Sequence, residues 1–222
     1  MKIQTTSIAL ALVMVAGAAQ AQTAGTWMVR GGVTNITPAV DSGNLSASSL
    51  PGTKIDADGN TQLGGGITYM LDDHWAVDLP LATPFKHNLY GAGAISGAGK
   101  IGETKAVPIS LFAQYHFGEA NAQFRPYIGG GPTYAKFYKE KGTAVLTAIT
   151  GGSSSNPTTL SLDSKLALTL QAGATFALNE RWFIDGMVAK TFLKTTGTLS
   201  TGQTINVTLN PVTVSAAIGY KF

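Results

Sequence analysis

The chain has 222 residues, of which 12% are charged and 44% hydrophobic. Soluble domains usually carry about 25% charged residues, so this composition indicates a protein with little of its surface in water. The net charge of +3 is too small to favour nucleic acid as a partner, and the absence of cysteine excludes disulfides and thiolate metal sites.

The N-terminus has the three parts of a secretory signal peptide. Lys2 provides a positive start, an apolar run from Ile8 to Ala19 follows, and Ala19-Gln20-Ala21 matches a small-x-small cleavage site. Because the run is too short to cross about 30 Å of hydrocarbon as a helix, we expect cleavage rather than an N-terminal membrane anchor. The sequence therefore predicts a signal peptide over residues 1–21 and one mature domain over residues 22–222.

The rest of the chain alternates between apolar and other residues with the period of two that is typical of β-strands. An apolar exported chain without a helical span can enter a membrane only as a closed barrel, because an open sheet edge in lipid leaves backbone groups without hydrogen bonds. Eight strands are expected, at Thr26–Val33, Thr61–Met70, Trp75–Thr83, Val107–Phe117, Phe124–Lys136, Lys165–Leu178, Trp182–Leu193 and Val212–Phe222.

The gaps between these segments are alternately long and short. The short turns are Leu71–His74, Gly118–Gln123 and Asn179–Arg181, whereas the long gaps are rich in Gly, Ser and Ala. This is the organisation of an outer-membrane barrel, with short periplasmic turns and long extracellular loops. Aromatic residues gather at the short-turn ends, as a membrane-interface girdle requires. The fold prediction is all-β: an eight-stranded antiparallel transmembrane β-barrel. The alternative is a soluble β-sandwich, which would need neither the girdle nor a signal peptide.

The final strand places Val212, Val214, Ile218, Tyr220 and Phe222 on one face, against small or polar residues on the other. An apolar face that ends in aromatic residues suits the closing strand of a barrel in lipid.

Four short segments are spread over almost the whole mature chain. They are Asn60-Thr61-Gln62-Leu63-Gly64, Ala82-Thr83-Pro84-Phe85-Lys86-His87, Phe124-Arg125-Pro126-Tyr127-Ile128-Gly129 and Gly219-Tyr220-Lys221-Phe222. Together they resemble the OmpW family of small outer-membrane barrels, whereas the loops at residues 91–100 and 142–157 match that family poorly. The final residues Ile218, Tyr220 and Phe222 resemble the C-terminal assembly signal of such barrels.

This resemblance implies an eight-stranded barrel with a narrow, rather apolar lumen that admits small hydrophobic molecules. The related AlkL-type barrels of alkane uptake are thought to do the same. The resemblance also implies that the C-terminal aromatic Phe222 is read by the barrel-assembly machinery, which would be a partner during biogenesis.

The alternation also predicts which residues face the lumen. Arg30 and Arg125 are expected opposite Asp78 and Asp185 near the periplasmic end, because charges inside a barrel must pair. These four residues either form a polar floor that closes the lumen or only stabilise the barrel. The apolar lining above them is predicted to be Pro80, Ala82, Pro108, Phe112, Met187, Ala189 and Leu193.

A closed floor leaves a sideways exit through the wall as a route for hydrophobic cargo. Pro80, Pro84, Pro108 and Pro132 each remove a backbone donor, so a weakened seam between the third, fourth and fifth strands is one hypothesis. The other is that these prolines only shape strand ends and loops.

Lysines are concentrated in or beside the predicted extracellular loops, where they would face the phosphates of lipopolysaccharide. Loop solubility is the alternative explanation, and only Lys190 is predicted to face lipid near the rim. The lysines are Lys54, Lys86, Lys100, Lys105, Lys136, Lys139, Lys141, Lys165, Lys190 and Lys194.

Three functions remain open: passage of small hydrophobic molecules, a structural or adhesive barrel, and a lipid-modifying enzyme. The third would need an external site such as His87 with Ser96, and we do not expect it. No metal or other cofactor is expected, since the three histidines are scattered. The predicted partners are outer-membrane lipid, lipopolysaccharide and small hydrophobic ligands. The sequence indicates neither the cargo nor an oligomeric state.

Overall fold

The computed structural model describes residues 21–47 and 49–222. The predicted signal peptide, apart from its last residue, lies outside the described residues. Among the helices of the described part, none is long and apolar enough to cross a membrane.

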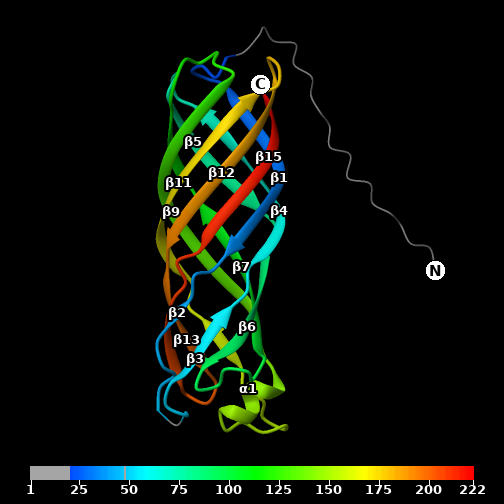
Figure 1. Cartoon of the computed structure of the whole chain (residues 1–222), viewed down its shortest axis with the longest axis vertical. Helices are drawn as coiled ribbons and strands as arrows, with labels where there is room; N and C mark the ends of the chain where they lie inside the picture. Colours follow the sequence, from blue (N-terminus) through cyan, green and yellow to red (C-terminus); the bar gives the residue numbers. More distant parts are fainter. Residues whose placement is uncertain (1–20, 48) are drawn as a thin grey trace, which may run out of the picture.

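Eight antiparallel strands form a closed ring (Figure 1). The ring closes because the first of the eight strands pairs with the last, and because the fifth strand in chain order pairs with the sixth. In ring order the strands are β1 (Trp27–Thr37), β4 (Asn60–Met70), β5 (Trp75–Ala82), β8 (Phe112–His116), β9 (Phe124–Gly142), β11 (Lys165–Ala177), β12 (Trp182–Phe192) and β15 (Val212–Lys221).

The ring confirms the predicted fold class and the position of all eight segments. The fourth segment differs in one respect, because it is interrupted at Leu111 into β7 (Lys100–Ser110) and β8. Here the chain changes neighbours: β8 pairs with β5, whereas β7 pairs with β6 (Phe85–Gly93).

Side chains follow the predicted alternation. On β11, Leu166, Leu168 and Leu170 are 73%, 53% and 50% exposed, whereas Thr169 and Gln171, which have the opposite parity, are buried. The exposed set belongs in lipid, and the buried set faces the lumen. At the end with the short turns, aromatic rings contact one another around the outside, including Trp27 with Tyr69, Trp75 with Tyr115, and Trp182 with Tyr220. This is the expected girdle.

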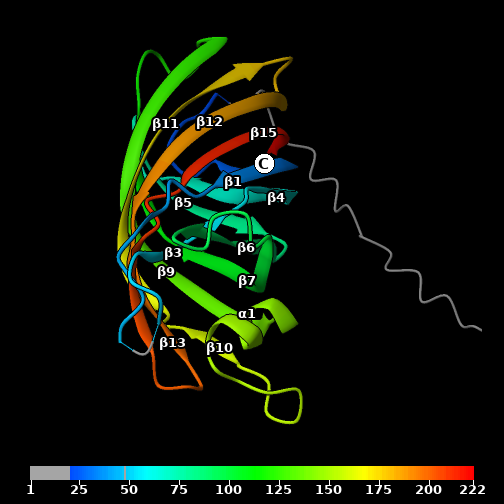
Figure 2. The same ribbon diagram turned by 60° about the horizontal axis from the view of Figure 1, so that its bottom comes forward.

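The extracellular part contains more regular structure than the sequence predicts. Residues expected to be loops form β2 (Asp41–Ser42), β3 (Thr53–Ala57), β6, β10 (Leu160–Leu162), β13 (Lys194–Leu199), β14 (Thr204–Thr208) and the helix α1 (Ala144–Ile149). They extend the wall of the barrel beyond the ring, at the bottom of Figure 1 and towards the viewer in Figure 2. They are ordered around a small apolar core of Leu89, Ile101, Leu146 and Leu199.

Candidate functional site

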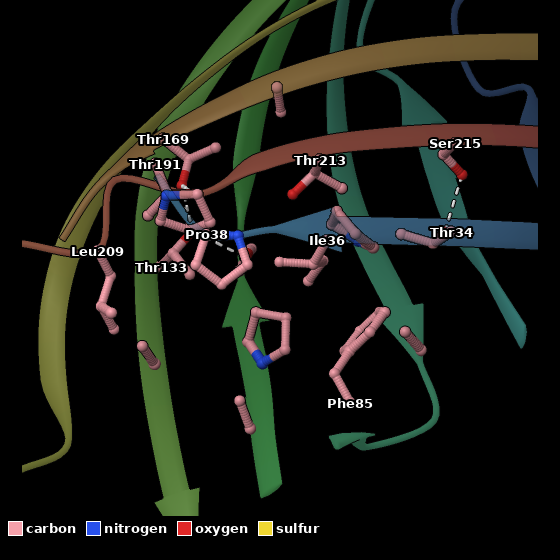
Figure 3. A pocket seen from close by; sticks show the side chains of 18 of the residues that line it. Thr34, Ile36, Pro38, Phe85, Thr133, Thr169, Thr191, Leu209, Thr213 and Ser215 are labelled. Atoms are coloured by element: carbon pink, nitrogen blue, oxygen red, sulfur yellow. Dashed lines mark hydrogen bonds between the residues drawn. The ribbon is translucent and has the colours of Figure 1, made fainter. Parts of the chain in front are cut away.

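The extracellular half of the lumen holds a cavity with about 1180 Å³ of empty space, including its open mouth. Its wall is mostly apolar, with residues from strands on all sides of the ring. Figure 3 shows Ile36, Pro38, Phe85 and Leu209 pointing into this common space, together with several hydroxyl side chains. Arg30 is the only Lys, Arg, Asp or Glu side chain of the wall, and it lies at the cavity's periplasmic end.

Six of the seven residues expected to line an apolar lumen lie in the cavity wall: Pro80, Ala82, Pro108, Phe112, Met187 and Ala189. Leu193 was placed there wrongly. It is buried but follows the last residue of β12, where the chain turns towards β13, and its carbonyl accepts the N–H groups of Leu209 and Asn210. Its side chain keeps the buried parity of Thr191, but it is not among the residues that line the cavity.

A buried ion cluster fills the barrel below the cavity. The Arg30 guanidinium makes a bidentate contact with Asp78, at 2.8 and 3.0 Å, and its Nε lies 3.4 Å from Oδ1 of Asp185. Thr68 donates a hydrogen bond to Asp78 at 2.6 Å, and the Tyr127 hydroxyl donates one to Asp185 at 3.0 Å. Each buried carboxylate therefore has a cation and a hydroxyl as partners, as buried charges require.

Two glycines make room for this cluster. A Cβ at Gly66 would lie 2.9 Å from Nη2 of Arg30, and a Cβ at Gly173 would lie 2.5 Å from the Tyr127 hydroxyl. Small residues on one strand thus allow long polar side chains to cross the lumen from another strand.

Arg125 does not join this cluster, which corrects the expectation of two arginines facing two aspartates. As the second residue of β9, it lies level with the periplasmic turns. Its fully buried guanidinium donates hydrogen bonds to backbone carbonyls of Gln22, Asp73 and Phe117, and to the side-chain oxygen of Gln22 at 3.0 Å. Gln22 in turn donates to Thr175. The polar floor therefore has two layers, one ionic and one that ties the turns together.

The ladder is interrupted beside the cavity. β5 pairs with β8 only from Trp75 to Asp78, and among the described residues no ladder joins Leu79–Ala82 to β7. Pro80, Pro84 and Pro108 border this seam, which is the unpaired stretch between β5 and β7. Pro132 does not, since its strand is paired on both sides and its carbonyl accepts the Leu111 N–H.

Each of the three histidines has a carbonyl oxygen as a hydrogen-bond partner, and His74 contacts the backbone carbonyl of His116 at 3.0 Å. His87 contacts the Asp58 carbonyl at 2.7 Å, and His116 contacts Gln114 and stacks on Tyr127. No group of His, Asp or Glu within the described ranges could hold a metal ion.

Sequence reasoning missed Thr68, Tyr127 and Gln22 as parts of the floor. Tyr127 shares the inward parity of Arg125 and Gly129, so the alternation was a signal that could have identified it. The sequence reasoning also missed the hydrogen bonds between hydroxyl groups of the cavity wall, because these bonds depend on the strand register.

The family model described as OmpW family matches residues 23–222 of the chain. Outer membrane protein W of Vibrio cholerae is 34% identical over 204 residues, which cover 89% of each chain. The crystal structure of OprG from Pseudomonas aeruginosa has 31% sequence identity and a TM-score of 0.81, and the match covers 91% of this chain and 99% of that one. A second Pseudomonas aeruginosa protein, named Dibenzothiophene metabolism operon protein PahQ, is 28% identical over 202 residues, 88% of each chain.

Proposed function

The chain belongs to the OmpW family of bacterial outer-membrane β-barrels, and on this premise we propose that it takes up small hydrophobic molecules through the apolar half of its lumen. Cargo enters the cavity from the extracellular side, stops at the ion cluster and leaves sideways into the membrane.

The observation that carries this proposal is the apolar cavity above a buried ion cluster. A pore for ions needs a continuous polar path, whereas this wall offers mainly Pro, Ala, Phe and Leu side chains. An eight-stranded barrel filled completely by its own side chains would suit a purely structural role, but here the upper lumen has room for a ligand.

The name of one relative supports the choice of cargo. PahQ is named after an operon for the metabolism of dibenzothiophene, which is an uncharged fused aromatic compound. We propose that the cargo of this chain is likewise a compact molecule without charge.

The seam between β5 and β7 supports lateral release. Pro80, Leu81 and Ala82 on one side of it, and Pro108 and Ser110 on the other, all belong to the cavity wall. A molecule in the cavity therefore meets a stretch of the wall in which, among the described residues, no ladder of backbone hydrogen bonds joins the two strands. Lipid on the outer side is a favourable destination for apolar cargo.

Two neighbouring residues of β12 provide the test. Met187 lines the cavity, whereas Val188 is 50% exposed on the outer face. In cells that depend on this chain for dibenzothiophene uptake, Met187→Trp fills the cavity and is expected to lower uptake about tenfold, the effect of roughly 1.4 kcal/mol. Val188→Trp, a matched control in lipid, should keep the wild-type rate.

Equal uptake by both variants at equal amounts of folded protein would contradict the proposal. So would unchanged uptake after deletion of the chain.

We also propose that the lysines beside the extracellular strands contact lipopolysaccharide. Lys86 and Lys100 both pair with Glu103, at 2.8 and 2.7 Å, which leaves this group of three with one net positive charge. Lys190, the residue expected to face lipid, donates a hydrogen bond to the Asn210 carbonyl at 2.6 Å. Recognition of Phe222 by the assembly machinery stays a prediction.

A further inference from the structure

We propose that a row of hydroxyl groups in the cavity wall recognises a single neutral polar group, a hydroxyl or a carbonyl, on otherwise apolar cargo. This inference rests on the proposed uptake function and specifies its ligand class. The hydroxyl row is defined as Ser110, Thr133, Thr169 and Thr191.

The row crosses four neighbouring strands at one level of the lumen. Its oxygens form an unbroken chain, with 2.8 Å from Ser110 to Thr133, 2.7 Å from Thr133 to Thr169 and 2.8 Å from Thr169 to Thr191. All four residues are buried and line the cavity. Figure 3 shows Thr133, Thr169 and Thr191 grouped on one side of the space, opposite Phe85 and Ile36.

Counting protons shows that the hydroxyl row has capacity left for a ligand. Four hydroxyls carry four protons, and three bonds within the row use three of them. One of the four hydroxyls thus keeps a proton with no acceptor among the described residues. The oxygens also retain lone pairs, so the row can both donate to and accept from a ligand.

More hydroxyls lie across the cavity. The Thr34 and Ser215 oxygens are 2.9 Å apart, and Ser215 donates to the Val33 carbonyl, which occupies both of their protons. Thr213 lines the same space, and its hydroxyl has no hydrogen bond to another described side chain or carbonyl. The cavity therefore has a mostly apolar wall, with neutral polar groups at one level of the lumen.

The ion cluster argues against a charged ligand. Arg30 is held by Asp78 and Asp185, so its guanidinium is already paired and is not free to bind a carboxylate. An ammonium group would need a carboxylate that is not already bonded, yet Asp78 also accepts from Thr68 and Asp185 from Tyr127. Burying an unpaired ion costs far more than burying a hydroxyl or a carbonyl that finds a partner.

Cross-strand threonine pairs also stabilise sheets, and a row with that role alone would not distinguish between ligands. The test must therefore measure ligand selectivity. We would titrate the protein in lipid nanodiscs with 1-hexanol, n-hexane and hexanoate, and follow the Met187 methyl resonance as a reporter inside the cavity.

Wild type is expected to bind 1-hexanol three- to tenfold more tightly than n-hexane, the effect of about one net hydrogen bond, and hexanoate more weakly than both. The double variant Thr133→Val with Thr169→Val should lose the preference for the alcohol and keep its affinity for the alkane. Thr104→Val is the control, because it removes a cavity hydroxyl outside the row. If the double variant does not fold, Thr191→Val at the end of the row takes its place.

A preference for 1-hexanol that survives in the valine variants overturns the inference, as does equal binding of alcohol and alkane by wild type. In both cases binding of n-hexane leaves the uptake proposal standing. Tighter binding of hexanoate overturns the choice of a neutral ligand. If no ligand shifts the Met187 signal in wild type, the inference and the uptake proposal both fail.

Discussion

The periplasmic and extracellular halves of the lumen are lined by the same strands, yet one is filled and the other is hollow. Below, Arg30 reaches across the lumen to Asp78 and Asp185, and Arg125 holds the turns together. Above, the inward positions carry Pro, Ala and Thr, whose side chains are too short to meet in the middle. The alternation decides which residues point inward, and their length and polarity decide whether the space closes.

The two halves also differ in their walls. The lower part of β5 is paired on both sides, from Trp75 to Asp78, whereas its upper part is paired only with β4. The seam therefore begins at the level where the ion cluster ends. This coincidence separates a sealed half, which contains the ion cluster, from an open half, which contains the cavity proposed to bind the cargo.

The largest expected effect is on the sealed half. Asp78→Ala leaves Arg30 with its longer contact to Asp185 and a hydrogen bond to Thr68, so a buried cation loses its main ionic partner. We expect the free energy of unfolding in lipid vesicles to fall by about 3–5 kcal/mol, as when a buried pair is broken. Ion conductance through the variant should rise, because the closing layer has lost a member.

Asp163→Ala is the matched control, since Asp163 pairs with Lys165 at 3.1 Å on the surface and both side chains are about half exposed. It should change stability by less than about 1 kcal/mol. Unchanged conductance of the Asp78 variant would show that the cluster stabilises the barrel without closing it.

Arg125→Ala tests the second layer of the floor. It removes hydrogen bonds from a charged donor to carbonyls of the turns, which are close to water and can be solvated. The expected loss of stability is about 1.5–3 kcal/mol, less than for Asp78. Conductance should stay at the wild-type level, because the ion cluster above remains intact. A rise in ion conductance would instead place the closure at the turns.

Most of the sealed half could be predicted from the sequence. The period-two alternation along a strand shows which side chains face the lumen, even when the adjacent strands are not known. Parity identified Arg30, Asp78 and Asp185, and it extends to Tyr127. It could not provide the partners of Arg125, which are mainly backbone carbonyls in turns far away in the sequence.

The open half was harder to predict. The hydroxyl row depends on the register between β9 and β11, where Thr133 and Thr169 are diagonal rather than opposite, and one sequence does not determine a register. The added strands β3 and β6 were missed because Gly and Ala around them indicate a loop. Buried Leu89 shows that β6 is nevertheless anchored by apolar contacts.

The smallest effect on stability, and the most specific one on function, is expected at the seam. Leu81 and Ile109 are 51% and 54% exposed on its two sides, and the chain contains no cysteine, so Leu81→Cys with Ile109→Cys can be joined by a short bifunctional thiol reagent. Joining them should slow dibenzothiophene uptake about tenfold. The bridge should not lower the temperature of thermal unfolding, because no native hydrogen bond crosses this gap between described residues and none has to be broken. The control is Ala172→Cys with Val188→Cys, which are opposite each other in the paired β11–β12 ladder. A bridge there restrains strands that are already bonded, so uptake should not change. If the two bridges slow uptake equally, or if neither does, the seam is not the exit, and the difference between the two halves concerns binding alone.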